Sequence, residues 1–332
     1  MKYIESINSS LHDLMRDYPE VYVIGEDIVD PYGGAFRATK GLSTKYPIRV
    51  ITTPICEASI VGLSIGMALR GLRPITEIMF GDFLGISFDQ ILNHASKYVT
   101  MYNGKISLPL TIRTPMGGGR GYGPTHSQSI EKYFMGMPNI EIVSPSLFHD
   151  AGKNLVLSVL KNTPTIFIEN KLLYPEMVIT DSNNYLLREE SIDNQNGYPI
   201  VVVKNFRALE PDITIVAYGG ISRLLNSVLI KMIEEEIRIT AIIPCNISPI
   251  TKSLIESINN HSFVSKKCLL IEESSIDFGW TAELASQINQ NGIKIVRLGS
   301  YNSIIPSAKA LESKMLISEE IIIKTIIGLL RK

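Results

Sequence analysis

Short apolar runs alternate with amphipathic segments along the first half of the chain. Apolar residues recur every three to four positions between Ile4 and Met15, which predicts an opening helix, and an apolar run closed by Gly25 follows it. The alternation continues with predicted strands at residues 21–24, 49–53, 74–79, 108–113, 140–144 and 165–169 and predicted helices at residues 57–70, 88–101 and 148–161. This order predicts an α/β fold in which helices cover both faces of a parallel sheet.

A second, smaller α/β domain is predicted beyond a polar segment. Apolar density falls over residues 183–198, where Asn, Asp, Ser and Glu accumulate, so we place a linker there between a first domain at 1–182 and a second at 199–332. In the second domain, strands are predicted at residues 213–217, 237–243, 267–272 and 294–298, and helices at residues 223–235, 250–259 and 282–291.

Composition narrows the classes of partner. The 332 residues are 45% hydrophobic, which excludes intrinsic disorder, and 32 basic against 33 acidic residues leave a net charge of -1. This balance argues against nucleic acid as the main partner, and the absence of a polybasic run argues against an anionic membrane surface. No apolar stretch reaches the roughly 18 residues of a membrane span. The mean hydropathy of +0.15 therefore predicts apolar surface buried in the fold or against partners.

The beginning of the chain and its cysteines favour a cytoplasmic setting. Residues 2–17 combine acidic side chains with helical periodicity, unlike a secretory or organellar signal. Cys56, Cys245 and Cys268 are odd in number and lack CxxC spacing, which argues against a disulfide framework or a zinc site. We expect Cys56 to be a packed thiol rather than a nucleophile.

A glycine-rich segment follows one predicted strand at the sheet edge where ligands bind in parallel sheets. Residues 114–129 contain neither a GxGxxG dinucleotide fingerprint nor a P-loop, so a structural loop and a ligand-contacting loop both remain open. His126, near its end, is either a hydrogen-bonded loop residue or a group that contacts substrate and transfers protons.

Two further residues follow strands at the same predicted edge. Glu57 stands in the first turn of a helix, where a carboxylate interacts favourably with the helix dipole whether or not it has a chemical role. Phe80 and Phe83 are either core residues or flank a flat ligand. Gly62 and Gly66 share one face of the helix after Glu57, which permits close approach of another backbone or an internal packing contact.

Several ordered motifs resemble one family. They are RVITTPICEASIVG at residues 49–62, GLRPITEIMFGDF at 71–83, DQILNHASK at 89–97 and THSQS at 125–129. Together they resemble the beta subunit of the decarboxylating first component of 2-oxo acid dehydrogenase complexes, which act on pyruvate, branched-chain 2-oxo acids or acetoin. This family belongs to the transketolase-like thiamine diphosphate enzymes. The resemblance covers nearly the whole chain and is strongest over residues 22–174.

The resemblance implies a fold and a set of site residues. The first domain would be a pyrimidine-binding transketolase-like domain, and the second a transketolase C-terminal-like domain used mainly for subunit association. Glu57 occupies the position of the glutamate that hydrogen-bonds a pyrimidine nitrogen and activates the cofactor. Phe83 and Met79 match cofactor-binding positions, and His126 matches an active-site histidine linked to substrate or acyl transfer. No metal ligand is carried over to this chain.

The resemblance also implies a partner. Related enzymes hold the diphosphate through Mg²⁺ with a Gly-Asp-Gly motif followed by Asn, and this chain has no such motif. An alpha subunit is therefore expected to supply the magnesium site in an alpha2-beta2 heterotetramer with a beta-beta contact, and a lipoyl acyltransferase is a further candidate partner.

Three functions stay open at this point. The first is oxidative decarboxylation of a 2-oxo acid, the second is half of a split transketolase or acyloin-forming synthase, and the third is a noncatalytic assembly subunit. The acyl acceptor is open because residues 243–251 lack the Arg and Asp common in the family, and Phe278 replaces its usual His.

Overall fold

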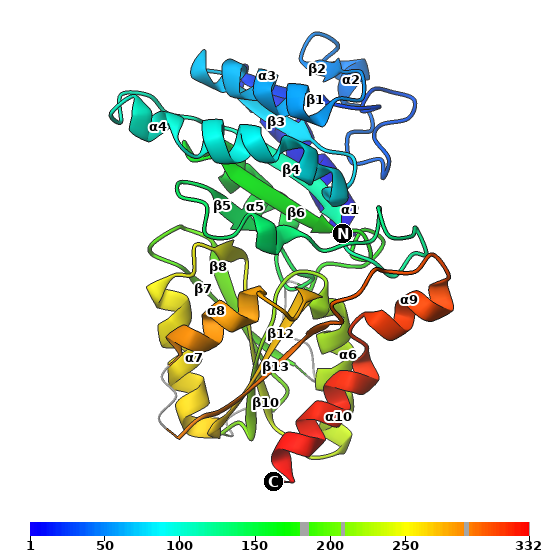
Figure 1. Ribbon diagram of the computed structural model, residues 1–332, viewed down its shortest axis with the longest axis vertical. Coiled ribbons are helices and arrows are strands. Elements are labelled where there is room, and N and C mark those ends of the chain that lie inside the picture. Colours follow the sequence, from blue (N-terminus) through cyan, green and yellow to red (C-terminus); the bar gives the residue numbers. More distant parts are fainter. Residues whose placement is uncertain (180–185, 207–209, 289–291, 332) are drawn as a thin grey trace.

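The chain folds into two α/β domains that lie one above the other along the long axis (Figure 1). The computed structural model describes residues 1–179, 186–206, 210–288 and 292–331. Both domains are built on a central sheet with helices on its two faces, as the alternating pattern predicts.

The first sheet has seven strands in the order β11-β5-β6-β4-β3-β1-β2. Its strands are parallel except for β11, which pairs antiparallel with β5. Because they are buried on both faces, these strands appear in the sequence as continuous apolar runs. The strands are β1 (Val21–Gly25), β2 (Val50–Thr52), β3 (Arg73–Glu77), β4 (Thr111–Met116), β5 (Glu141–Val143), β6 (Thr165–Asn170) and β11 (Asn246–Ser248).

Alternate residues of these strands enter two apolar cores. Val23 packs in the core beneath α1 and α5, whereas its neighbour Ile24 packs in the core beneath α3 on the opposite face. The helices and helical turns of this domain are α1 (Tyr3–Asp17), α2 (Leu42–Lys45), α3 (Glu57–Leu69), η1 (Gly81–Ser87), η2 (Gln90–Ala95), α4 (Tyr98–Met101), η3 (Glu131–Tyr133) and α5 (Ala151–Leu160).

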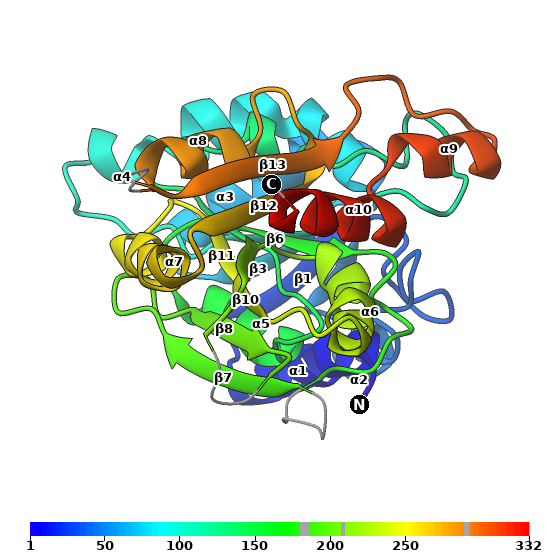
Figure 2. The same cartoon turned by 90° about the horizontal axis from the view of Figure 1, so that it is seen from below.

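The second sheet has six strands in the order β13-β12-β9-β10-β8-β7, of which β7 and β8 run antiparallel to their neighbours. Helices α6 and α7 lie on opposite sides of it (Figure 2). The strands are β7 (Leu187–Ile192), β8 (Pro199–Lys204), β9 (Ile213–Val216), β10 (Ile239–Pro244), β12 (Lys267–Ser275) and β13 (Lys294–Ser300). The helices are α6 (Ile221–Glu234), α7 (Lys252–Ser265), α8 (Trp280–Gln287), α9 (Lys309–Met315) and α10 (Glu319–Leu330).

The predicted linker at residues 183–198 is wrong over Leu187–Ile192. This segment is β7, an edge strand of the second sheet paired with β8. Its last four side chains are exposed, and an exposed edge strand lacks the apolar run that marks a buried one. Residues 183–185 lie outside the described part of the chain.

Two other expectations change. The predicted helix at residues 88–101 is divided into the π-helical η2 and the short α4. The predicted helix at 282–291 begins earlier, at Trp280, and its residues 289–291 lie outside the described residues. In addition, β11 comes from the second half of the chain but completes the first sheet, so the two domains share backbone hydrogen bonding.

Candidate active site at the carboxyl edge of the first sheet

The residues singled out in the sequence follow strands that end at one edge. Strands β2, β1, β3, β4 and β6 are parallel neighbours, so the segments after them emerge on the same side of the sheet. Glu57 follows β2, Met79 and Phe83 follow β3, and the glycine-rich loop with His126 follows β4. The predicted strand pattern is therefore right in bringing these segments to a common edge.

Glu57 is a buried carboxyl at the first position of α3. Only 4% of its surface is exposed, and no hydrogen bond or ion pair within the described residues involves its side chain. A second carboxyl, Glu26, follows β1 directly and is 3% exposed, with its Oε1 atom unpartnered. Burial and the nearby Glu57 carboxyl raise the pKa of Glu26 from 4.5 to about 7. Sequence reasoning missed Glu26, although its position after Gly25 at a strand end was a usable signal.

Cys56 is exposed, so the expectation of a packed thiol is wrong. It precedes Glu57 as the N-cap of α3, and its Sγ atom donates to Ser59 Oγ over 3.1 Å. Hydrogen bonding by Ser59 lowers the pKa of this thiol. Cys245 and Cys268 are buried free thiols.

A buried ion network lies beneath the same edge. The Arg113 guanidinium of β4 donates to Glu77 of β3, and its Nε and Nη2 atoms donate to Glu169 of β6 over 2.8 and 2.7 Å. Tyr174 donates to Glu169 over 2.8 Å. Although burial lowers the pKa of Arg113, the two carboxylates raise it above its ordinary value. The network links three adjacent strands directly below the loops of the site.

Aromatic side chains gather around His126. The imidazole lies edge-on to Phe80 and Phe83, with ring centroids 4.7 and 5.1 Å away. Phe80 also contacts the rings of Phe36 and Tyr122, at 5.9 and 6.3 Å. Phe83 is half-buried and His126 is half-buried, so the cluster has one side open to solvent. The structure thus brings together two of the predicted site residues, His126 and Phe83.

A buried lysine lies beneath this aromatic cluster. Lys171, directly after β6, is fully buried, and its Nζ atom donates to the backbone oxygen of His126 over 2.5 Å. The ammonium group lies 5.3 Å from the centroid of the Phe80 ring and 5.7 Å from that of Tyr122. Burial lowers the pKa of Lys171 to about 8. No periodic pattern distinguishes this lysine in the sequence.

The His126 segment is also tied to the turn that carries Phe83. The Asp82 carboxylate accepts hydrogen bonds from the backbone and side chain of Gln128, over 3.1 and 2.9 Å. Met79 precedes this turn and is half-buried. Within the described residues, no hydrogen bond, ion pair or ring contact joins Glu57 to Met79, Phe83 or His126. A common role for these four residues therefore stays a prediction.

The helix after Glu57 presents small residues to solvent. A Cβ atom at Gly66 would meet nothing within 4 Å, and one at Gly62 would meet only Gln90 Cγ at 3.8 Å. Leu63, between them, is 54% exposed. Neither glycine makes a close contact within the described chain. Of the two predicted roles, close approach of another backbone therefore stays open, and internal packing does not.

Buried acids join the two domains behind the site. Tyr218, after β9, donates to Glu131 Oε1 over 2.5 Å, and Asn170 donates to Glu273 over 2.5 Å. Burial raises the pKa of Glu131 to about 7, and burial together with the Glu131 charge raises the pKa of Glu273 to about 8. The contact between the domains is therefore polar at this point as well as apolar.

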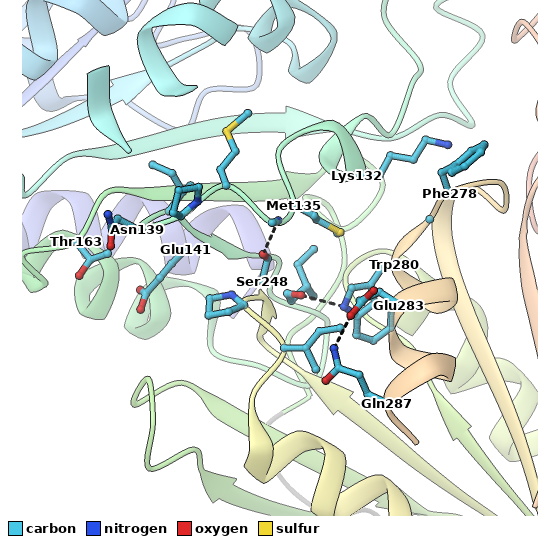
Figure 3. A pocket seen from close by; sticks show the side chains of 18 residues that line it. Lys132, Met135, Asn139, Glu141, Thr163, Ser248, Phe278, Trp280, Glu283 and Gln287 are labelled. Atoms are coloured by element: carbon cyan, nitrogen blue, oxygen red, sulfur yellow. Dashed lines mark hydrogen bonds between the residues drawn. The ribbon is translucent and has the colours of Figure 1, made fainter. Parts of the chain in front are cut away.

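A cavity lies elsewhere, between the domains. It has a volume of about 740 Å³ and receives side chains from η3 and β5 on one side and from α8 on the other (Figure 3). Trp280 donates to the backbone oxygen of Ile247 over 2.9 Å at its wall, and Phe278, 97% exposed, stands at its rim. None of the predicted site residues lines this cavity.

The described residues show neither a metal-binding cluster nor a membrane-spanning helix. Within residues 1–179, 186–206, 210–288 and 292–331, no group of three or more His, Cys, Asp or Glu side chains is arranged to hold a metal ion. Over those same ranges, every helix is too short or too polar to cross a bilayer.

The sequence is similar to known proteins along nearly its whole length. Residues 1–177 match the family described as the transketolase pyrimidine binding domain, and residues 203–322 match the transketolase C-terminal domain. The chain is 31% identical to the pyruvate dehydrogenase E1 component subunit beta of Gracilaria tenuistipitata var. liui, covering 97% of each chain. It is 33% identical to the mitochondrial 2-oxoisovalerate dehydrogenase subunit beta of Dictyostelium discoideum, over 87% of this chain and 75% of the relative.

One solved structure has the same architecture from end to end. It is a split gene transketolase described as an inactive beta4 tetramer, with a TM-score of 0.71, 17% identity, and coverage of 100% of this chain and 98% of that one. At this identity the likeness concerns the fold, and it confirms the predicted pair of transketolase-like domains.

Proposed function

Because this chain belongs to the transketolase-like family that contains the beta subunits of the pyruvate dehydrogenase E1 component, we propose that it is the beta subunit of a thiamine diphosphate dependent 2-oxo acid dehydrogenase. The observation that carries the proposal is the pair of buried carboxyls, Glu57 and Glu26, at the strand ends of the domain that matches the pyrimidine-binding family.

The residues present fit the aminopyrimidine ring of this cofactor. Buried polar atoms are normally hydrogen-bonded, yet the buried Oε1 atom of Glu26 has no partner among the described residues. An aminopyrimidine offers ring nitrogens and an exocyclic amine that would satisfy such groups. Phe83, on the turn against which α3 packs, offers a flat apolar face, and Met79 adjoins the same turn. These residues would hold the ring.

Each side chain then has a distinct task. When bound, thiamine diphosphate supplies an electron sink next to the substrate carbonyl. Glu57 binds a ring nitrogen through its carboxyl group and fixes the protonation of that nitrogen. Glu26, with its pKa raised to about 7, is partly protonated near neutral pH, which limits charge repulsion between the two carboxyls.

His126 is proposed to act on the substrate or acyl group. Its Nδ1 atom lies 3.0 Å from Thr125 Oγ1, which orients the ring and leaves Nε2 to exchange a proton. Edge-on contacts with Phe80 and Phe83 restrict rotation of the imidazole.

An alpha subunit is proposed to complete the site. It would supply the Gly-Asp-Gly and Asn ligands for Mg²⁺ and the diphosphate, which this sequence lacks. The exposed face of α3 with Gly62, Leu63 and Gly66 is the proposed site of close subunit packing in an alpha2-beta2 assembly, together with a beta-beta contact. Docking to a lipoyl acyltransferase and a cytoplasmic setting are further predictions.

The substrate is tested with the two chains together. Co-expressed with an alpha-type chain that carries the Gly-Asp-Gly and Asn motif, the protein should decarboxylate pyruvate or a branched-chain 2-oxo acid and reduce an artificial electron acceptor only when thiamine diphosphate and Mg²⁺ are present. Omitting either chain is the control. Turnover of sugar phosphates with an aldehyde acceptor, and none of 2-oxo acids, would overturn the proposal in favour of a split transketolase.

A further inference from the structure

A carboxylate from the second domain is inserted into the glycine-rich loop of the first. Gly119 and Gly121 donate their backbone N–H groups to Glu312 Oε1 and Oε2 over 2.8 and 2.7 Å. Glu312 lies in α9, close to the boundary between the domains (Figure 1), and its side chain is fully buried. No other hydrogen bond of the described residues involves this carboxylate.

The loop is built around this carboxylate. Gly119 and Gly121 have φ values of +91° and +75°, a conformation that turns their N–H groups toward one anion and that other residues adopt only with strain. A Cβ atom at Gly118 would lie 3.1 Å from Glu312 Oε1 and 2.9 Å from Leu316 Cδ1. From the sequence alone, these glycines could belong either to a structural loop or to a ligand-contacting loop. In the structure, they are needed for the close approach of α9.

The same loop carries side chains into the aromatic cluster. Arg120, between the two donor glycines, donates to the backbone oxygen of Lys171 over 2.9 Å and lies 5.4 Å from the centroid of the Phe36 ring. Tyr122 contacts Phe80, and Lys171 in turn binds the backbone of His126. The Glu312 carboxylate therefore fixes the loop on one side, and the loop and Lys171 together contact the His126 segment on the other.

We propose that Glu312 is a positioning residue, through which the second domain holds the glycine loop and thereby the orientation of Arg120 and His126 in the active site. This role rests on the proposed function, because it assigns His126 to the reaction. It gives the second domain a part in the site beyond subunit association. A charged acceptor makes stronger hydrogen bonds to backbone N–H groups than a neutral one, which explains a carboxylate at this position.

Hydrogen exchange in the assembled enzyme tests directly whether Glu312 holds the glycine loop. In Glu312→Ala, amide exchange in the peptide over residues 117–128 should rise roughly tenfold, because both donors lose their acceptor, while exchange in α3 stays unchanged. Glu312→Gln keeps one acceptor oxygen and should give an intermediate increase. It also keeps the test valid if the alanine variant fails to fold. Glu320→Gln, on an exposed residue, is the charge-matched control.

Kinetics separate positioning from a merely structural contact. Glu312→Gln should lower kcat by about tenfold while the Kd of thiamine diphosphate stays near that of the wild type, because the loop misplaces groups around the substrate. Unchanged exchange in residues 117–128 would show that Glu312 does not hold the loop. Raised exchange with unchanged kcat would show that Glu312 holds the loop but does not position the active-site groups. If the wild type turned over no 2-oxo acid, the proposed function would fail. The exchange result would still show whether Glu312 holds the loop.

Discussion

The imidazole ring of His126 stands edge-on to the phenyl ring of Phe83, with centroids 5.1 Å apart and planes at 83°. His126 lies in the loop after β4 and Phe83 in the helical turn η1 after β3, far apart in the sequence. Edge-to-face packing fixes ring orientation and contributes about 0.5–1.5 kcal/mol beyond the burial of area. The pair therefore links a proposed cofactor contact to a proposed catalytic histidine.

Separate substitutions of the two rings should give different kinetic effects. His126→Ala removes the exchanging nitrogen, so it should lower kcat by about a hundredfold and leave the Kd of thiamine diphosphate almost unchanged. Phe83→Ala removes the flat apolar surface and should raise that Kd. Steady-state kinetics and fluorescence titration of the assembled enzyme measure both. Wild-type turnover in His126→Ala would remove this histidine from the site.

Removing the buried guanidinium should destabilise the first domain. Arg113→Met leaves Glu77 and Glu169 without their common partner and should lower the free energy of unfolding by about 3–5 kcal/mol. Urea unfolding followed by circular dichroism measures the change. Arg16→Met, which breaks an ion pair of exposed side chains, should change the stability little. Equal losses in the two variants would show that burial of the network does not matter.

The acids between the domains should make stability fall as pH rises. Burial raises the pKa of Glu131 from 4.5 to about 7 in the folded chain, so the folded state holds this proton more tightly than the unfolded state. The resulting stabilisation is full below pH 4.5 and is lost as pH rises through about 7.

Glu131→Gln keeps an acceptor for Tyr218 but cannot ionise. Relative to the wild type, this variant should therefore gain about 3 kcal/mol of unfolding free energy between pH 4.5 and pH 8. Urea unfolding at the two pH values measures this gain, and Glu320→Gln serves as the exposed control. A difference between Glu131→Gln and wild type that does not vary with pH would contradict the raised pKa.

The parts of the fold and site that could be predicted share a local signal. Buried parallel strands give apolar runs, and those runs indicated the sheet edge to which Glu57, Phe83 and His126 were assigned. Strand β7 was taken for a linker because its exposed side chains carry no such signal. Lys171 and Glu312 were missed because their importance comes from burial and from partners distant in the chain. The partner of Glu312, for example, is the backbone of Gly119. Such pairs have no periodicity that a single sequence can display.

Proton exchange at the thiazolium carbon of bound thiamine diphosphate tests whether Glu57 activates the cofactor in the assembled enzyme. Hydrogen-deuterium exchange at this carbon is followed by quenching and proton NMR, with Glu57→Gln compared against the wild type. We expect that the variant still assembles with its alpha subunit and binds the cofactor but loses most of the accelerated exchange. Exchange at the wild-type rate in Glu57→Gln would contradict the assignment of this carboxyl as the activating group.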